Sequence, residues 1–173
     1  QLPVIPNGMG RGVVASGHPL LVTRARSFAL KTADLVVVVG TPLDFRLGYG
    51  KFGPADAPAQ VAHVVDHPDQ ISQQASPAAA VGGALGPTLD AITEAWEKHP
   101  IRQQRADWLT GLQEQAAAAV AADATVLAST VDPIHPARIY GELNKRLADD
   151  SVVIGDGGDF VSSAGKFIEP KKP

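Results

Sequence analysis

The sequence predicts an α/β fold with a doubly wound, mostly parallel sheet. Short apolar runs rich in β-branched residues end at glycine or aspartate, and segments of helical composition alternate with them along the 173 residues. Apolar runs without polar alternation are typical of parallel strands covered on both faces, and strands that alternate with helices are typical of a doubly wound layer. Apolar residues make up 45% of the chain, which is enough for a substantial core.

The clearest strand signal is residues 35–39, five apolar and mostly β-branched residues that stop at Gly40. We expect this strand to be buried on both faces of the sheet. A weaker run at residues 61–65 stops at Asp66, and another short strand is expected around Val81.

Three helices are expected in the first two thirds of the chain, at residues 24–33, 85–98 and 102–122. The second has apolar residues three and four positions apart, which would form one stripe along the helix. The third is rich in Gln and Ala, a composition that suits an exposed linking helix. A short strand is also expected at residues 2–5, where an apolar run meets a turn.

We divide the chain into a first domain at residues 1–98, a linker helix at 99–131 and the start of a second α/β unit at 132–173. In that second unit Pro136 stands where a first-turn proline belongs, and a strand is expected at residues 151–154. Fewer than 45 residues cannot bury an independent core. We therefore expect the second unit to be incomplete and the chain to be cut at this side.

Composition narrows the classes of partner and compartment. The net charge is −3 with scattered Lys and Arg, so no basic face indicates nucleic acid and no polybasic run indicates a membrane surface. The chain has no cysteine, which excludes disulfides and thiolate metal sites. The longest apolar run is far too short to span a bilayer. These features predict a cytoplasmic protein.

Polar residues at the ends of the expected strands mark a candidate ligand site, because ligands of open α/β sheets bind at the carboxyl ends of the strands. A glycine there lets a ligand approach the backbone, an arginine can bind phosphate, and a carboxylate can accept hydrogen bonds from ribose hydroxyls. The candidate nucleotide-binding residues, from these ends and from the helix at 24–33, are Asn7, Arg26, Gly40, Thr41, Asp44, Arg46 and Asp66.

Simpler roles are open for several of these residues. Asp44 and Arg46 could form a loop ion pair, Asp66 could cap a turn, and Arg26 could be an exposed helix residue. No metal site is predicted, because His63 and His67 lie across a strand end with no third ligand nearby.

A glycine-rich run forms a second candidate site, between the strand at 151–154 and a following helix. Backbone N–H groups of such a turn can bind phosphate oxygens. A tight turn explains the run equally well. The residues placed beside a possible diphosphate are Gly157, Gly158 and Asp159.

Four stretches follow one another in the order LPVIPNGMGRGVV with HPLL, ARSFALKTADLVVVVGTPLDFRLGYG, VAHVVDHPDQI and DPIHPARIYGELNKRLADDSVVIGDGGDF. Together they cover nearly the whole chain and resemble the thiamine diphosphate-dependent enzymes, in particular the acetolactate synthase large subunit and its close relatives. The resemblance makes residues 1–98 the central domain, which in this family holds FAD, or ADP in the relatives that act on coenzyme A thioesters. It makes residues 132–173 the start of the thiamine diphosphate domain.

The resemblance also implies what the parent enzyme does. It would condense 2-keto acids such as pyruvate, as in branched-chain amino acid biosynthesis, with thiamine diphosphate and Mg²⁺ as cofactors and as a homodimer or homotetramer. The alternatives are an oxalyl-CoA decarboxylase or 2-hydroxyacyl-CoA lyase with an acyl-CoA substrate, and a non-catalytic adenine-nucleotide-binding module. The family's first strand would precede Gln1, so the chain is expected to be cut at this end as well.

Two departures from the family pattern stand out. Gly82 and Gly83 replace a Gly-Asp pair, and Asp159 and Phe160 stand where Gln and His are usual. The family's metal-diphosphate fingerprint joins Gly-Asp-Gly to a later Asn-Asn, which is not in the sequence, and residues 155–157 imitate only its start. No catalytic residue is therefore predicted, and this chain alone is expected to be inactive.

Overall fold

The computed structural model describes residues 2–99 and 105–172, without the side chains of residues 159–161. Contacts between residues divide the chain into two compact units: Ser27–Arg105, here called the sheet unit, and Gln1–Arg26 with Ala106–Pro173, here called the helical unit. Clusters of contacts need not coincide with domains, so the domain limits at residues 98 and 131 stay a prediction.

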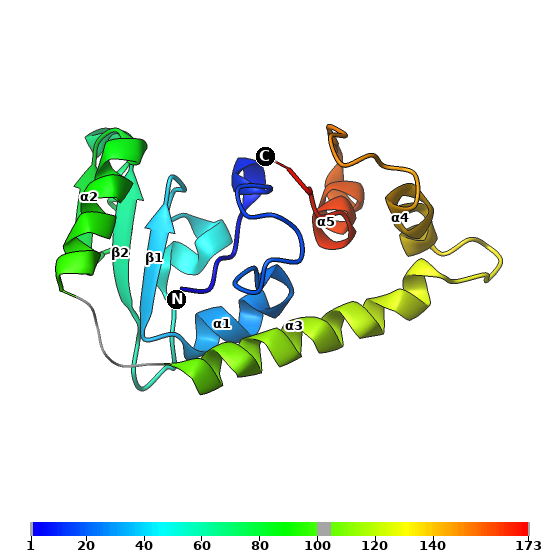
Figure 1. Ribbon diagram of the computed structural model, residues 1–173, viewed down its shortest axis with the longest axis horizontal. Helices are drawn as coiled ribbons and strands as arrows, with labels where there is room; N and C mark the ends of the chain where they lie inside the picture. The colour runs from blue at the N-terminus through cyan, green and yellow to red at the C-terminus, as the bar shows by residue number, and fades with distance from the viewer. Residues whose placement is uncertain (1, 100–104, 173) are drawn as a thin grey trace. The chain divides into compact units, whose positions relative to one another are not determined.

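The sheet unit has the parallel α/β fold that the sequence predicts. Its strands are β1 (Leu35–Val39), β2 (Gln60–Val65) and β3 (Ala79–Gly82), which pair in the order β1-β2-β3, all parallel. Figure 1 shows β1 and β2 as neighbouring arrows that point the same way. Helix α1 (Arg26–Thr32) precedes β1 and helix α2 (Leu85–Lys98) follows β3, so the predicted helix at 85–98 is confirmed.

The connections between the strands differ from the expected alternation with α-helices. Residues 40–59 link β1 to β2 through a 3-10 segment, η3 (Phe45–Gly50), and η4 (Pro68–Gln70) is the only helical turn between β2 and β3 in the described residues. Proline occurs in both links and glycine is frequent in the first, and each disfavours an α-helix, glycine through backbone entropy and proline through its missing N–H.

The β1–β2 link takes the place of a covering helix by folding back over one face of the sheet. Leu43 and Phe52 from this link pack with Val38 and Val61 in a buried cluster. The link is also tied to α1, because the Gly53 N–H donates to the Leu30 carbonyl at 2.8 Å. This side of the sheet therefore has a genuine core.

The prediction that residues 35–39 are buried on both faces is wrong. Val38 is buried, but Leu35, Val37 and Val39, which lie on the opposite face, are exposed. Strand β1 is the edge of the described sheet, and no described segment fully covers that second face. The central strand β2 is the one buried on both faces, with Val61 on one side and Val64 on the other.

The helical unit contains α3 (Ala106–Leu127), α4 (Pro136–Asn144) and α5 (Gly158–Phe167), with two 3-10 turns, η1 (Gly8–Gly10) and η2 (Thr23–Ala25). Residues 102–104 of the predicted linking helix lie outside the described residues. Leu112 of α3 is fully buried, and Asp123 of α3 pairs with Arg24 and with Lys166, whose Nζ lies 2.7 Å from its Oδ1. No described helix is both long and apolar enough to cross a membrane.

Two predicted strands are wrong, both in the helical unit. Residues 2–5 make only a single parallel bridge, Val4 to Leu21, and prolines on both sides remove the N–H groups that a longer ladder needs. Residues 151–154 have no strand structure and are exposed, because no described segment offers them a partner. The helix expected after the glycine-rich turn is confirmed as α5.

Candidate functional site

The carboxyl ends of β1, β2 and β3 meet at one edge of the sheet unit. The Gly40 N–H donates to the Val64 carbonyl at 2.8 Å, and the Gly83 N–H donates to the Val65 carbonyl at 2.9 Å. Gly40 has φ +64°, and a Cβ at this position would lie 3.3 Å from Cδ1 of Leu85. The first residue of α2 therefore lies beside the end of β1, where the backbone conformation favours glycine.

The N-terminus of α2 adds backbone donors to this edge. Its N-cap residue is Ala84, which makes no side-chain capping bond, and Gly86 in the first turn has open space around its Cβ position. The first N–H groups of a helix have no intrahelical acceptor, and the helix dipole is positive there. Beside Gly40, this end of α2 suits an anionic group such as a phosphate.

Asp66 directly follows β2 and is exposed at the same edge. Strands β1 and β2 are paired in parallel, with Val39 opposite Val64, so Gly40 and Asp66 lie at neighbouring strand ends. An exposed carboxylate beside a glycine is the arrangement that accepts hydrogen bonds from ribose hydroxyls in dinucleotide-binding sheets.

The Asp44–Arg46 pair completes the loop after β1. The Asp44 carboxylate accepts the Arg46 N–H at 2.9 Å, and the Arg46 guanidinium donates to both carboxylate oxygens, with Nε 3.0 Å from Oδ2. The hydrogen bond from Arg46 lowers the pKa of Asp44, and the same contact raises the pKa of Arg46. The loop ion pair considered from the sequence is thus present, and both groups keep their charges near neutral pH.

Beyond Arg46 the loop turns through the left-handed region of backbone conformation. Gly48 has φ +55° and Tyr49 has φ +53°, and Tyr49 is the one described non-glycine residue with positive φ. A bulky side chain is uncommon in this region, so the loop stores strain at Tyr49. The Tyr49 N–H donates to the Asp44 carbonyl at 2.9 Å, which closes the turn.

The structure brings Gly40, Thr41, Asp44, Arg46 and Asp66 into the sheet unit and places the other predicted residues in the helical unit. Asn7 is exposed at the start of η1, and Arg26 is half-buried at the start of α1. Whether they share a site with the strand ends stays a prediction.

In the predicted diphosphate turn, Gly157 and Gly158 are exposed. The Asp156 carboxylate accepts the Gly157 N–H at 2.7 Å, a bond within the turn itself. Asp159 belongs to α5, but its side chain lies outside the described residues. Within residues 2–99 and 105–172, no three His, Cys, Asp or Glu side chains are grouped as metal ligands would be.

Sequence reasoning missed a role for His63, which was considered only as a metal ligand. Its side chain is fully buried under the loop after β1, with Nε2 3.0 Å from the Thr41 carbonyl oxygen. The signal in the sequence was a single histidine inside the apolar run of β2.

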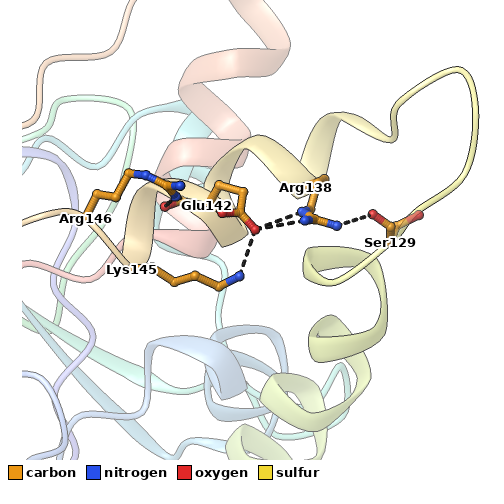
Figure 2. Close-up of polar contacts among 5 residues, drawn as sticks. All are labelled: Ser129, Arg138, Glu142, Lys145 and Arg146. Carbon is orange, nitrogen blue, oxygen red and sulfur yellow. Dashed lines mark hydrogen bonds and ion pairs between the residues drawn. The ribbon is translucent and has the colours of Figure 1, made fainter.

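A second polar cluster lies in the helical unit, on α4 and the residues that flank it (Figure 2). Glu142 accepts hydrogen bonds from Lys145 at 2.7 Å, Arg146 at 2.7 Å and Arg138 at 3.0 Å, and Arg138 also donates to the Ser129 carbonyl at 2.9 Å. Hydrogen bonds from Lys145 and Arg146 lower the pKa of Glu142 to about 2.

Ser129, Arg138, Glu142 and Arg146 border an open hollow of about 620 Å³ whose walls are mostly apolar. The charged groups beside it are already paired, because Glu142 forms ion pairs with both Arg138 and Arg146. We therefore place the candidate site at the strand ends of the sheet unit.

A three-stranded parallel sheet with helices on either side of it in the chain defines an α/β protein. Residues 1–92 match the family model of the thiamine pyrophosphate enzyme central domain, so the chain belongs to the thiamine pyrophosphate enzymes.

Relatives along the whole chain agree with this assignment. The chain is 38% identical to the acetolactate synthase large subunit IlvG of Mycobacterium tuberculosis, over all of this chain and 30% of that protein. It is 30% identical to 2-hydroxyacyl-CoA lyase 2 of Danio rerio, over 99% of this chain and 28% of that protein. The chain thus spans less than a third of the length of these curated relatives.

Proposed function

We propose that the sheet unit binds an adenine nucleotide, as FAD or ADP, within an acetolactate synthase-like enzyme that uses thiamine diphosphate. One observation carries this proposal: Gly40, Asp66 and the N-terminus of α2 adjoin one another at the carboxyl edge of a parallel sheet. Gly40 lets a ligand approach the backbone closely, and the Asp66 carboxylate can accept hydrogen bonds from ribose hydroxyls. The N-terminus of α2 offers backbone N–H groups to a phosphate.

The described residues fit a nucleotide but not the thiamine diphosphate itself. A diphosphate held through Mg²⁺ needs several oxygen ligands around the metal. The Asp156 carboxylate is bonded within its own turn, and the described residues hold no group of acidic side chains around it. No catalytic step is therefore assigned to this chain, and its residues position a nucleotide.

The parent reaction proposed is the condensation of two 2-keto acids such as pyruvate, in a cytoplasmic homodimer or homotetramer. When bound, thiamine diphosphate supplies the stabilised carbanion for such a reaction. The 38% identity to an acetolactate synthase large subunit supports this choice. The second candidate is a 2-hydroxyacyl-CoA lyase, favoured by the relative of that name and by the ARSFAL segment at residues 25–30.

Calorimetric titration of the full chain with FAD and with ADP tests the nucleotide site. Asp66→Ala should weaken binding by about 1–3 kcal/mol, because the ribose hydroxyls lose a charged acceptor. Asp56→Ala is the matched control. Asp56 is also an exposed carboxylate, but it precedes β2 and so lies toward the amino ends of the strands. Equal affinities of both variants and the unaltered chain would remove Asp66 from the site.

The ligand itself separates the two candidate reactions. Tighter binding of FAD than of ADP supports the acetolactate synthase-like reading, and tighter binding of ADP or coenzyme A supports the lyase. Incubation of the chain with pyruvate, thiamine diphosphate and Mg²⁺ should give no acetolactate. Turnover above background would contradict the assignment of the chain to nucleotide binding alone.

A further inference from the structure

His63 is the one polar residue that is fully buried in the described part of the chain. It lies in the middle of β2, opposite Val38 of β1 in the strand register, and so on the face that the β1–β2 link covers. Its neighbours on this face are apolar core residues. An imidazole here loses its contact with water at both nitrogens, which an aliphatic side chain would not.

The hydrogen bond of His63 determines how its ring is protonated. Nε2 lies 3.0 Å from the Thr41 carbonyl oxygen. A carbonyl oxygen can only accept, so Nε2 must carry the hydrogen. Nδ1 is also buried and has no hydrogen-bond partner among the described residues. The ring thus makes a single bond in the described structure, and it makes this bond to the loop after β1.

The position of Thr41 explains what this bond achieves. Thr41 follows Gly40, the residue at the end of β1, and precedes Pro42 and the buried Leu43. With its carbonyl bonded to His63, Thr41 turns a partly negative oxygen toward the core and away from the edge proposed for phosphate. Because the peptide group is planar, the same bond restrains the direction in which the chain enters the Asp44–Arg46 segment.

We propose that His63 is a positioning residue of the nucleotide site, whose Nε2–H holds the Thr41 carbonyl inward and so orders residues 40–46. This inference rests on the proposed function, since it assigns the loop a ligand. It predicts that nucleotide binding depends on the hydrogen-bond donor at position 63 and not on the aromatic ring.

Three variants of the full chain separate the donor from general stability. His63→Phe keeps an aromatic ring and removes the donor, His63→Gln restores an N–H of similar reach, and His63→Val replaces the ring if the phenylalanine variant does not fold. Val61→Ala is the matched control, because it removes buried volume from the same strand and face without a hydrogen bond to the loop.

Hydrogen exchange and nucleotide affinity are measured for each variant. In His63→Phe the amides of residues 41 and 43–46 should exchange hydrogen about tenfold faster, and FAD or ADP should bind about tenfold more weakly. His63→Gln should recover most of both losses. Val61→Ala should lower the unfolding temperature and leave the exchange of this loop, relative to the rest of the sheet, unchanged.

Hydrogen exchange and nucleotide affinity together distinguish a failure of this inference from a failure of the proposed function. If the unaltered chain binds neither nucleotide, the proposed function fails, while faster exchange confined to residues 41–46 in His63→Phe would still support the positioning role. If loop exchange and affinity are the same in His63→Phe as in the unaltered chain, the inference is wrong. It is also wrong if His63→Gln is as impaired as His63→Phe.

Discussion

Two glycine-containing loops of this chain look alike locally and differ in what lies beneath them. The loop after β1 begins at Gly40 with φ +64°, and the turn before α5 contains Gly157 with φ +78°. Beneath the first loop lies a core in which Leu43 is 2% exposed. The segment that leads into the second is open to solvent, with Ile154 91% exposed.

The difference shows that the first loop is supported by a packed core and the second is not. Both glycines have a positive φ, which glycine adopts without steric cost. The first is also held by His63, by its packing on the sheet and by the bond between Gly53 and α1. The second has short-range contacts, from the Gly157 N–H to the Asp156 carboxylate and from the Ser162 hydroxyl to the Gly158 carbonyl. The first loop is therefore the better candidate for an ordered ligand site.

Core truncation should give the largest contrast between the two regions. Leu43→Ala should lower the free energy of unfolding of the sheet unit by about 3 kcal/mol, because it opens a cavity beneath the loop. Val152→Ala, which alters a side chain that is 86% exposed, should change it by no more than about 0.5 kcal/mol. Urea unfolding followed by Trp96 fluorescence, in a Trp108→Phe background, measures the first effect. Similar small effects at both positions would remove the contrast.

A methyl group on one glycine of each region gives the next contrast. A Cβ at Gly53 would lie 2.4 Å from the Ala59 nitrogen, whereas a Cβ at Gly157 would have nothing within 4 Å. Gly157→Ala should cost about 1–3 kcal/mol, because φ +78° with ψ 138° is a conformation that few residues other than glycine adopt. Gly53→Ala should cost more, because a backbone clash adds to its positive φ. Denaturant titration followed by circular dichroism checks both, and a larger cost at Gly157 would reverse the proposed ranking.

A glycine at position 49 tests whether the loop after β1 is held in a strained conformation. Tyr49→Gly removes a bulky side chain from the left-handed region and should raise the unfolding free energy by about 0.5–1 kcal/mol. Phe45→Gly, in the same loop but without positive φ, is the control and should be neutral or slightly destabilising. Thermal unfolding of the two variants decides the point, and stabilisation by both would speak against strain at Tyr49.

Low pH should lower the stability of the helical unit through Glu142 of α4 and not through the glycine-rich turn before α5. The folded pKa of Glu142 is about 2, below its ordinary value of 4.5. The contribution of this depressed pKa is therefore fully present above about pH 4.5 and is lost as the pH falls toward 2. Carboxyl NMR titration of Glu142 should show the low pKa, and Glu142→Gln should remove this small pH dependence. An ordinary pKa would mean that the three cations do not hold the carboxylate in solution.

Much of the sheet unit could be predicted because local pattern and tertiary environment agree there. The run at residues 35–39 and the helix at 85–98 have the composition of the elements they form. The strand at 151–154 failed although its composition is similar, because a strand requires a partner and β-propensity alone does not supply one. Burial failed at β1 for a related reason, since sequence cannot reveal which strand of a sheet is at its edge.

The candidate site was predictable to the extent that it follows from strand ends. Gly40 and Asp66 were found because parallel strands bring their carboxyl ends together. The Asp44–Arg46 pair was considered from the sequence, but its geometry depends on the turn. The role of His63 could not be read from spacing, because its partner Thr41 lies 22 positions earlier and the two meet only through the register of β1 and β2.

The open face of β1 also has a consequence for the behaviour of the protein at high concentration. Leu35–Val39 is an uncharged, proline-free run at the edge of the described sheet, with three of its apolar side chains exposed. Short segments of this kind stack in register into cross-β fibrils whose side chains interlock without water. Long storage of concentrated solutions should therefore favour fibril nucleation at this strand, and a lysine in place of Val37 would act as a gatekeeper against it.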